Sequence, residues 1–306
     1  MPDYILEPMF KQFLTGLDPN LDPTALPLEE SRSLFDDVPP GAVLRDASVK
    51  ERTIDTDYGE IVLTVTRPLG TENETLPAIV YFHGGGWAQG IKYSHALIQR
   101  ELAIEGRVAV VFVNYDRSPE VKFPVAIEQC YASVAWLANK ENAASLSVDA
   151  NKIAVAGDSA GVLAKKRKLS AIKFQILYYP VTNDDFETPS YCDLAKGYFL
   201  TKDWMKLFWN LYIPVEERSS ILACPLKATL EDLKDLPPAY VVAVEADVLR
   251  DEGEAYAARL MEAGVDVVAV RTFGALHGFF NMPKLTSIGE AVVQQSVHLL
   301  HKAWKK

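Results

Sequence analysis

The sequence predicts an α/β fold in which a mostly parallel β-sheet is covered by helices on both faces. Short apolar runs rich in Val, Ile and Ala occur at residues 78–82, 108–113 and 152–156, as expected of buried strands in a parallel sheet. Segments with helical spacing separate these runs, and strands that alternate with helices are typical of α/β domains. The chain has 306 residues, 49% of them hydrophobic, which is enough for a substantial core.

Residues 1–47 differ in character from the rest of the chain. They are polar and interrupted by prolines, and they contain short helical patterns at residues 4–16 and 27–37. A segment of this size cannot bury enough apolar surface to form a core of its own. We therefore interpret residues 1–47 as a helical arm that lies over another part of the molecule.

From about Ala47 the pattern becomes that of strands, which then alternate with helices. Residues 61–67 alternate apolar and polar side chains, as a half-buried strand does. In parallel sheets, binding sites gather at the carboxyl ends of the strands. The further predicted strands are residues 78–82, 108–113, 152–156, 174–179, 239–245 and 267–273, and the predicted helices are residues 94–105, 124–139, 252–263 and 288–302.

The alternation is interrupted at residues 183–224, where aromatic side chains are frequent. Such a stretch is typical of a helical insertion. The predicted core is therefore discontinuous, and it comprises residues 48–182 and 225–306.

Charge and hydropathy exclude several function classes. Lys and Arg together number 31 and Asp and Glu 41, which gives a net charge of −10. Nucleic-acid-binding proteins usually carry a basic surface, so we expect no nucleic-acid partner. The dense cationic run at residues 165–168 is typical of a solvated helix face. No stretch approaches eighteen consecutive apolar residues, so we expect no membrane span.

The three cysteines are isolated and odd in number. Cys130, Cys192 and Cys224 have neither the spacing of a metal site nor that of a disulfide framework. The first residues lack the cationic segment followed by an apolar one that is typical of a signal peptide. We therefore expect a cytoplasmic protein in a reducing compartment, with no metal site.

A G-x-S-x-G pattern occupies residues 157–161, directly after the predicted strand 152–156. In this motif the serine sits on a sharp turn between a strand and a helix, so that its hydroxyl is exposed at the edge of the sheet. We interpret Ser159 as a nucleophile, with the N–H of Ala160 facing the developing oxyanion. A tight turn without chemistry is the competing interpretation, and it weakens when partner residues are present.

Three consecutive glycines come after the predicted strand 78–82, in the sequence His83-Gly-Gly-Gly-Trp87. Such a run costs backbone entropy, which is understandable where N–H groups must approach a ligand closely. We predict that Gly84 and Gly85 donate to the oxyanion that forms when Ser159 attacks a carbonyl. A phosphate-binding loop is the alternative, but this stretch lacks the Lys-Ser/Thr ending of such loops.

A serine nucleophile needs a base, and the chain has five histidines. His277 is the candidate by position and by elimination, because it follows the last predicted strand in a glycine-containing loop. Asp247 stands just past another predicted strand, where its carboxylate reaches a histidine on the neighbouring loop. Asp251 and Glu252 instead suit the start of the next helix. The order Ser159, Asp247, His277 is that of α/β-hydrolases and not of the serine proteases.

Together these motifs resemble the hormone-sensitive-lipase-like family of α/β-hydrolases, which includes many carboxylesterases and the arylacetamide-deacetylase-like enzymes. The resemblance covers about residues 45–305. It implies an α/β-hydrolase fold with a mostly parallel eight-stranded sheet, and a helical cap made from the arm and the insertion 183–224. It rests on five stretches, at residues 83–87, 118–124, 157–161, 247–252 and 277–279.

The resemblance also implies the roles of the site residues. Ser159 is the expected nucleophile, His277 the base and Asp247 the acid that orients it. The expected oxyanion hole is made of Gly84, Gly85 and Ala160.

The implied activity is that of a serine carboxylesterase acting on short-to-medium acyl esters, a small-molecule substrate, with no metal or organic cofactor. An amidase or deacetylase would use the same triad. A non-catalytic small-molecule-binding protein on the same scaffold is the alternative from another class, and it predicts a broken triad. We expect a monomer or a homodimer.

Aromatic side chains of the glycine loop and of the insertion are candidates for an acyl pocket. The competing interpretation for each is that it belongs to the core of the cap. The candidates are Trp87, Tyr198, Phe199, Trp204 and Phe208.

The chain departs from the family pattern in two places. Where the family usually has Tyr-Arg-Leu-Ala-Pro-Glu, residues 115–120 read Tyr-Asp-Arg-Ser-Pro-Glu, and we expect a structural arginine with local repacking. After Gly161 the family usually continues with Gly-Asn and a helix of several turns, whereas here the next strand begins near Phe174. A remaining helix of about eight residues would rise only about 12 Å, against a strand of about 17–20 Å.

Two hypotheses explain this short crossover. One is a true deletion, which would affect the exposure of Ser159 and the N–H of Ala160. The other is a sequence joined across a missing stretch. We favour the second, because the family pattern breaks abruptly at residues 160–162 while the rest of the chain agrees with it.

Overall fold

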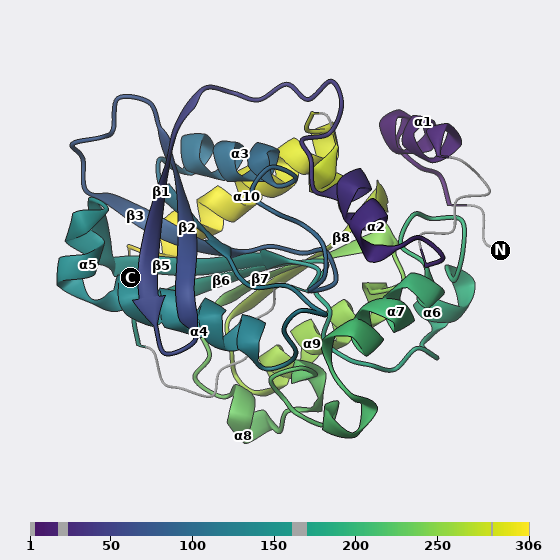
Figure 1. Cartoon of the computed structure of the whole chain (residues 1–306). Coiled ribbons are helices and arrows are strands. Elements are labelled where there is room, and N and C mark those ends of the chain that lie inside the picture. Colours follow the sequence, from purple (N-terminus) through teal and green to yellow (C-terminus); the bar gives the residue numbers. More distant parts are fainter. Residues whose placement is uncertain (1–3, 18–23, 161–169, 283, 306) are drawn as a thin grey trace.

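The computed structural model describes residues 4–17, 24–160, 170–282 and 284–305 (Figure 1). These residues form one eight-stranded sheet with the strand order β1-β2-β4-β3-β5-β6-β7-β8. The predicted α/β fold with an eight-stranded sheet is confirmed. The strands are β1 (Ala47–Thr56), β2 (Gly59–Pro68), β3 (Leu76–Phe82), β4 (Ala109–Asn114), β5 (Val148–Asp158), β6 (Ile172–Tyr178), β7 (Ala239–Ala246) and β8 (Val267–Leu276).

The sheet is mostly parallel. Strand β2 pairs antiparallel with both β1 and β4, whereas the pairs from β4 through β3, β5, β6 and β7 to β8 are parallel. The carboxyl ends of β5, β7 and β8 therefore lie at the same edge of the sheet. These strands carry the three predicted triad residues at or just beyond their ends.

Helices cover both faces of the sheet (Figure 1). Strand β3 shows why, because its side chains alternate between the faces. Ile79 and Tyr81 join the core that contains Ile98 of α3, whereas Val80 and Phe82 join the core beneath α4. The covering helices are α3 (Ala96–Gly106) and α10 (Ser287–Ala303) on one face, and α4 (Val125–Ala138), α5 (Lys140–Ser145), α8 (Leu230–Leu233) and α9 (Arg250–Glu262) on the other.

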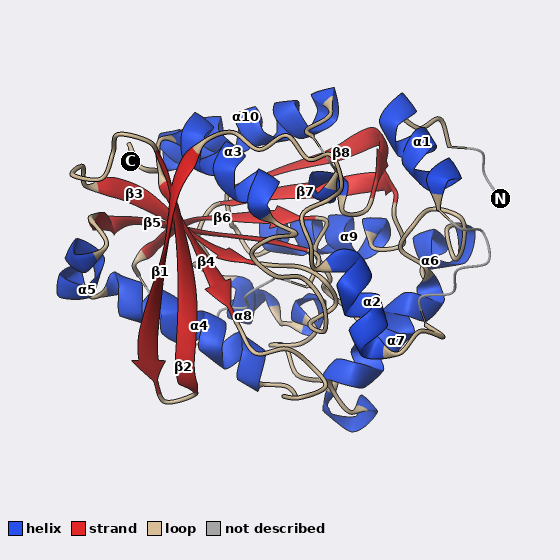
Figure 2. Cartoon of the chain, turned by 45° about the horizontal axis from the view of Figure 1, so that its top comes forward, coloured by secondary structure: helices blue, strands red, loops and turns tan. Residues whose placement is uncertain are grey.

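Helices of the arm and of the insertion meet at the edge toward which the parallel strands point (Figure 2). The ring centroids of Phe13 and Phe199 are 5.2 Å apart, and those of Phe35 and Trp204 are 5.1 Å apart. We propose that these helices form a cap over the carboxyl ends of the strands. They are α1 (Pro8–Gly16), α2 (Leu28–Phe35), α6 (Pro189–Asp193) and α7 (Lys202–Tyr212).

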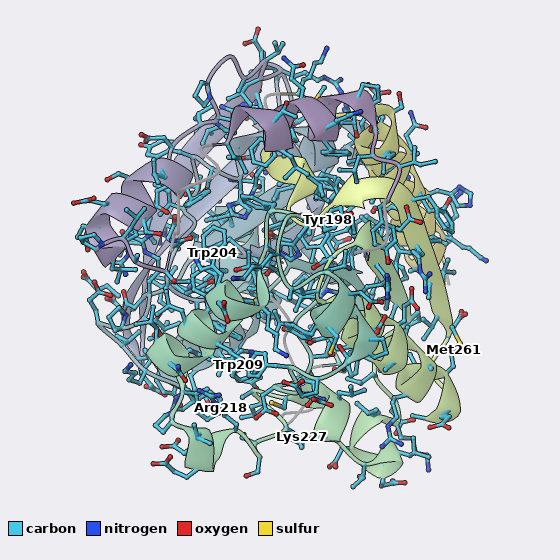
Figure 3. All side chains as sticks on the ribbon, turned by 90° about the vertical axis from the view of Figure 1, so that its right-hand side faces the viewer. Tyr198, Trp204, Trp209, Arg218, Lys227 and Met261 are labelled. Atoms are coloured by element: carbon cyan, nitrogen blue, oxygen red, sulfur yellow. The ribbon has the colours of Figure 1, made fainter. Side chains whose placement is uncertain are left out.

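Helix α7 buries four aromatic side chains of the insertion, among them Trp204 and Trp209 (Figure 3). Its N-terminus is capped by Thr201, whose hydroxyl accepts a hydrogen bond from the N–H of Trp204 (3.1 Å). Its buried side chains follow the spacing of one helix face, which turns inward because that face is apolar. They are Trp204, Met205, Phe208, Trp209 and Tyr212.

Two short helices, α5 and α8, have no counterpart among the predicted elements, since each is too brief to display a period, whereas α6 lies within the predicted helical insertion. The 3₁₀ turns are η1 (Val215–Glu217), η2 (Pro225–Lys227) and η3 (Phe279–Asn281). In the described ranges, no helix is both long and apolar enough to cross a membrane. The short crossover predicted after Gly161 and the cationic run at 165–168 fall at residues 161–169, outside the described residues.

Candidate active site

Ser159, His277 and Asp247 lie together in a chain of hydrogen bonds. Nδ1 of His277 is 2.7 Å from Oδ2 of Asp247, and its Nε2 is 3.1 Å from Oγ of Ser159. A carboxylate only accepts hydrogen bonds, so Nδ1 carries the proton and Nε2 is free to accept the proton of the serine hydroxyl. The Asp247 carboxylate is itself held by the N–H of Leu249 (3.0 Å). The structure thus brings all three predicted residues together.

Ser159 occupies a strained turn at the end of β5. Its φ of 52° lies in the left-handed region, which is uncommon for a residue with a side chain. The backbone around it is tied to the end of β6: the N–H of Ser159 donates to the carbonyl of Tyr178 (2.9 Å), and its carbonyl accepts from Val181 (2.8 Å). These bonds hold the turn that aims the hydroxyl at His277.

The glycine loop after β3 corrects one prediction. The N–H of Gly84 donates to Oδ1 of Asp158 (2.9 Å), so it is not available to an oxyanion. Gly84 is needed for a steric reason instead, because a Cβ there would lie 2.5 Å from the Asp158 carboxylate and 3.0 Å from Cβ of Ser159. The sequence could not reveal this, because Gly84 and Asp158 are 74 residues apart.

The next two glycines are better placed as donors. Gly85 and Gly86 line the pocket that contains Ser159 and His277. The N–H groups of Gly85, Gly86 and Ala160 donate to no acceptor among the described residues. Gly86 also has no room for a side chain, since a Cβ there would lie 2.1 Å from the ring of Phe208. Gly85 and Gly86, one residue later than the predicted pair, are therefore the candidate donors.

The carboxylate of Asp158 is buried and paired with His95. Nε2 of His95 is 3.3 Å from this carboxylate, while its Nδ1 faces the carbonyl of Ile91 (3.2 Å). Burial opposes both charges, but the facing charges outweigh it: the pKa of His95 is raised and that of Asp158 is lowered. Tyr81 also donates to Asp158 (2.9 Å). A buried ion pair therefore stands directly beside the nucleophile turn.

His83 is held neutral. Burial and the neighbouring charge of His95 lower its pKa to about 3. The imidazole stacks on the ring of Tyr115, with centroids 4.0 Å apart, and its Nδ1 donates to the carbonyl of Gly84 (2.8 Å). A neutral stacked ring suits a structural role at the start of the glycine loop. The described residues hold no group of three or more His, Cys, Asp or Glu side chains arranged to bind a metal ion.

A pocket of about 530 Å³ opens above Ser159 and His277. Of the predicted aromatic residues, Phe199, Trp204 and Phe208 line it. Sequence reasoning missed Phe35 of the arm, because no local pattern reveals that α2 reaches the nucleophile. The pocket is also lined by Gln89, Leu200 and Asn281.

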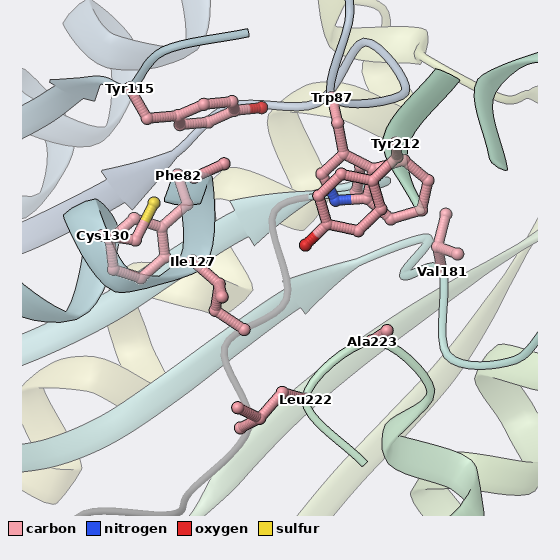
Figure 4. Close-up of a pocket in the computed structure, with 11 residues that line it drawn as sticks. Phe82, Trp87, Tyr115, Ile127, Cys130, Val181, Tyr212, Leu222 and Ala223 are labelled. Atoms are coloured by element: carbon pink, nitrogen blue, oxygen red, sulfur yellow. The ribbon is translucent and has the colours of Figure 1, made fainter. Parts of the chain in front are cut away.

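Two predicted pocket residues lie elsewhere. Tyr198 packs edge-on against Tyr4 of the arm, with ring centroids 5.6 Å apart, and does not line the pocket above Ser159. Trp87 stacks on Tyr212 of α7, with ring centroids 4.1 Å apart. Its ring lines a second pocket of about 430 Å³ beside Ala160 (Figure 4). That pocket contains neither the serine hydroxyl nor the histidine of the triad.

Known proteins that are similar to this chain show the family to which it belongs. A family model described as alpha/beta hydrolase fold matches residues 79–281. The chain belongs to this family. The carboxylesterase NlhH of Mycobacterium tuberculosis is 34% identical over 277 residues, and the match covers 85% of this chain and 86% of that protein. The predicted resemblance to esterases of the hormone-sensitive-lipase-like family is confirmed.

Two solved structures are similar over almost the whole of this α/β-hydrolase. One comes from a study of two fungal esterases from Rhizomucor miehei, with 46% identity, a TM-score of 0.94 and coverage of 99% of this chain and 98% of that one. The other is a thermostable esterase from Pseudomonas putida ECU1011, with 36% identity, a TM-score of 0.89 and 99% coverage of both chains.

A second buried carboxyl, that of Glu252, binds the backbone that follows β6 in this α/β-hydrolase. Glu252 lies in the first turn of α9, as predicted, and its Oε1 accepts the N–H groups of Thr182 (2.5 Å) and Asn183 (3.1 Å). Burial raises the pKa of Glu252 to about 8, even though these two N–H groups favour the charged form. The carboxyl thus anchors the chain that leaves β6, and the folded protein prefers it protonated.

Replacing Glu252 by Gln is expected to change the pH dependence of stability. A carboxyl whose folded pKa is raised stabilises the fold fully below its unfolded pKa, near 4.5, and this contribution is lost as the pH rises to about 8. The amide cannot ionise, so the variant does not lose this contribution. The free energy of unfolding of Glu252→Gln, relative to that of the wild type, should therefore increase by up to about 1.4 kcal/mol for each unit of pH rise in this window. Urea unfolding at pH 5, 6, 7 and 8 measures the difference.

Glu262, exposed at the other end of α9, provides the matched control. Glu262→Gln should leave the pH dependence of the unfolding free energy as in the wild type. A constant difference between Glu252→Gln and the wild type across the four pH values would contradict the prediction.

Proposed function

We propose that this chain is a serine carboxylesterase that hydrolyses short-to-medium acyl esters through an acyl-enzyme intermediate. One observation carries the proposal: the hydrogen-bonded chain from Asp247 through His277 to Ser159, set beneath an apolar pocket. The esterases among its relatives support the same activity.

In the first half of the reaction, His277 takes the proton of Ser159 as the oxygen attacks the ester carbonyl. The Nε2 atom is already 3.1 Å from Oγ, which is within the reach required of a general base. Asp247 fixes the imidazole in the required tautomer and stabilises the imidazolium that forms. The carbonyl oxygen becomes an oxyanion, to which Gly85, Gly86 and Ala160 donate their N–H groups.

In the second half, the tetrahedral intermediate collapses and the bond to the alcohol breaks. His277 returns the proton to the departing alkoxide, which leaves as an alcohol, and the acyl group remains on Ser159. A water molecule then gives its proton to His277 and attacks the acyl carbonyl. The carboxylic acid leaves and the serine hydroxyl is restored.

The pocket suits a small apolar acyl or alcohol group of the ester. Its walls are formed by Phe35, Phe199, Trp204 and Phe208, and aromatic walls are typical of small-molecule pockets. The binding-protein alternative predicts a broken triad, and the observed hydrogen-bond distances within Ser159, His277 and Asp247 argue against it.

The loss of Ser159 should abolish esterase activity. Because the three triad groups act as a unit, Ser159→Ala should lower kcat on p-nitrophenyl butyrate by about 10⁴–10⁶-fold. Hydrolysis of p-nitrophenyl esters from acetate to palmitate, run on both proteins, measures the loss and gives the acyl-length profile. We expect the rate to peak at short-to-medium chains.

Ser133, a buried serine of α4 outside this pocket, offers a control for this substitution. Ser133→Ala should keep the activity, since its hydroxyl donates to the carbonyl of Gln129 (2.8 Å) and contacts no residue of the triad. A folded wild-type protein that hydrolyses no ester in the series would refute the proposed function. Turnover of p-nitroacetanilide in preference to the esters would favour an amidase.

Shortening Phe35 should alter substrate selection. Removal of the ring enlarges the pocket, so Phe35→Ala should lower kcat/KM on p-nitrophenyl butyrate by roughly tenfold and shift the preferred acyl chain to greater length. Phe13 of the arm packs on Phe199 without lining the pocket. Phe13→Ala should therefore leave the chain-length profile unchanged, and equal profiles for Phe35→Ala and the wild type would show that Phe35 does not contact the acyl group.

A further inference from the structure

Arg32 of the arm is buried with every one of its five N–H groups paired. Nε donates to the carbonyl of Ala88 (2.8 Å), and Nη2 donates to the carbonyl of Ser118 (2.9 Å). The guanidinium also forms a two-point ion pair with Glu120, at 2.7 and 2.8 Å, and Nη1 contacts Glu29 (2.8 Å). A guanidinium has five donors in a fixed plane, so this set of acceptors is specific to arginine.

Two further hydrogen bonds join α2 and the residue after it to the turn at residues 88–90, which contains Ala88. Gln89 donates from its side chain to the hydroxyl of Ser31. The N–H of Gly90 donates to Oδ1 of Asp36 (2.7 Å), the residue that follows α2. Residues 88–90 are thus bound one after another by Arg32, Ser31 and Asp36.

This turn is joined directly to the proposed oxyanion donors. The N–H groups of Ala88 (3.1 Å) and Gln89 (2.8 Å) both donate to the carbonyl of Gly85. Gly85 and Gln89 are packed so closely that a Cβ on Gly85 would lie 2.3 Å from the carbonyl oxygen of Gln89. A shift of residues 88–90 would therefore move the peptide plane that carries the carbonyl of Gly85 and the N–H of Gly86. The N–H of Gly85 shares its peptide plane with the carbonyl of Gly84, which lies so close to the turn that a Cβ on Gly90 would be 2.5 Å from it.

The segment after β4 completes the attachment of the arm. Arg117 pairs with the second carboxylate oxygen of Asp36 (2.5 Å). Glu120 is bound by Arg32, whose hydrogen bond lowers the pKa of Glu120 to about 2. The arginine at the first departure from the family pattern, which we expected to be structural, thus binds the arm to the core.

We propose that Arg32 is a positioning residue for the oxyanion hole: the arm, through α2, holds the turn at residues 88–90 and with it the N–H groups of Gly85 and Gly86. The inference rests on the proposed function. It gives α2 two separate tasks, since Phe35 lines the pocket and Arg32 acts through the glycine loop.

The test compares Arg32→Met and Arg32→Lys with the wild type. Misplacing reacting groups by about 1 Å can cost about 100-fold in rate. We therefore expect Arg32→Met to lower kcat and kcat/KM on p-nitrophenyl butyrate together, by roughly 10–100-fold, with KM nearly unchanged. Arg32→Lys should recover only part of the loss, because an ammonium cannot bind Ala88, Ser118 and Glu120 in one plane.

A trifluoromethyl ketone supplies the readout that a purely structural role would not move. Such a ketone forms an oxyanion when Ser159 adds to it, so its inhibition constant should rise by the same factor by which kcat/KM falls. Arg67 is the matched control: it is also buried and donates to the carbonyls of Thr71 and Leu146, away from the active site. Arg67→Met should lower the melting temperature without changing kcat.

Each result bears on the proposal. A folded Arg32→Met protein with wild-type kcat, or one altered in KM alone, would overturn it. If Arg32→Met does not fold, Asp36→Ala and Ser31→Ala each remove one contact to the same turn, and both must lower kcat at constant KM for the proposal to hold. A wild-type protein that hydrolyses no ester would instead refute the proposed function, before any variant is compared.

Discussion

The geometry of the active site depends on the buried carboxylate of Asp158. This one side chain accepts hydrogen bonds from Gly84 and Tyr81 and pairs with His95, and it directly precedes the nucleophile. It therefore sets the distance between the glycine loop after β3 and the strained turn after β5. Because both loops leave adjacent parallel strands in register, this carboxylate holds the start of the glycine loop, at Gly84, beside Ser159.

Burying the charge of Asp158 costs free energy, and neighbouring side chains offset this cost. Taking an ion out of water costs several kcal/mol, which only good geometry and further hydrogen bonds can offset. His95 supplies the opposite charge, while His83, only 5.6 Å from it between ring centroids, stays neutral. Two charged imidazoles side by side would repel, so the charge of His95 adds to burial in lowering the pKa of His83, while the Asp158 carboxylate opposes this effect.

Much of the fold and the triad could be predicted from the sequence, because short local patterns indicate the strands and the residues that follow them. Buried strands have apolar runs, and Ser159, Asp247 and His277 each follow one. That the N–H of Gly84 is already taken could not be predicted, since it depends on which glycine meets Asp158 in space. The same holds for Phe35 in the pocket and for Tyr198 outside it, whose neighbours are set by packing between segments far apart in the chain.

The attachment of the arm to the glycine loop makes the reaction rate depend on a folding step, the binding of α2 to the core. If the glycine loop is competent only while α2 is bound to it, the observed rate is the intrinsic rate multiplied by the bound fraction. Each 1.4 kcal/mol of attachment free energy shifts that equilibrium tenfold, so the first such increment already keeps the loop competent for about nine-tenths of the time. Further contacts between the arm and the glycine loop then add little to the rate, and they mainly fix the position of the loop more closely. The planar set of hydrogen bonds made by Arg32 therefore matters for where it holds the carbonyl of Ala88 more than for how tightly it binds the arm.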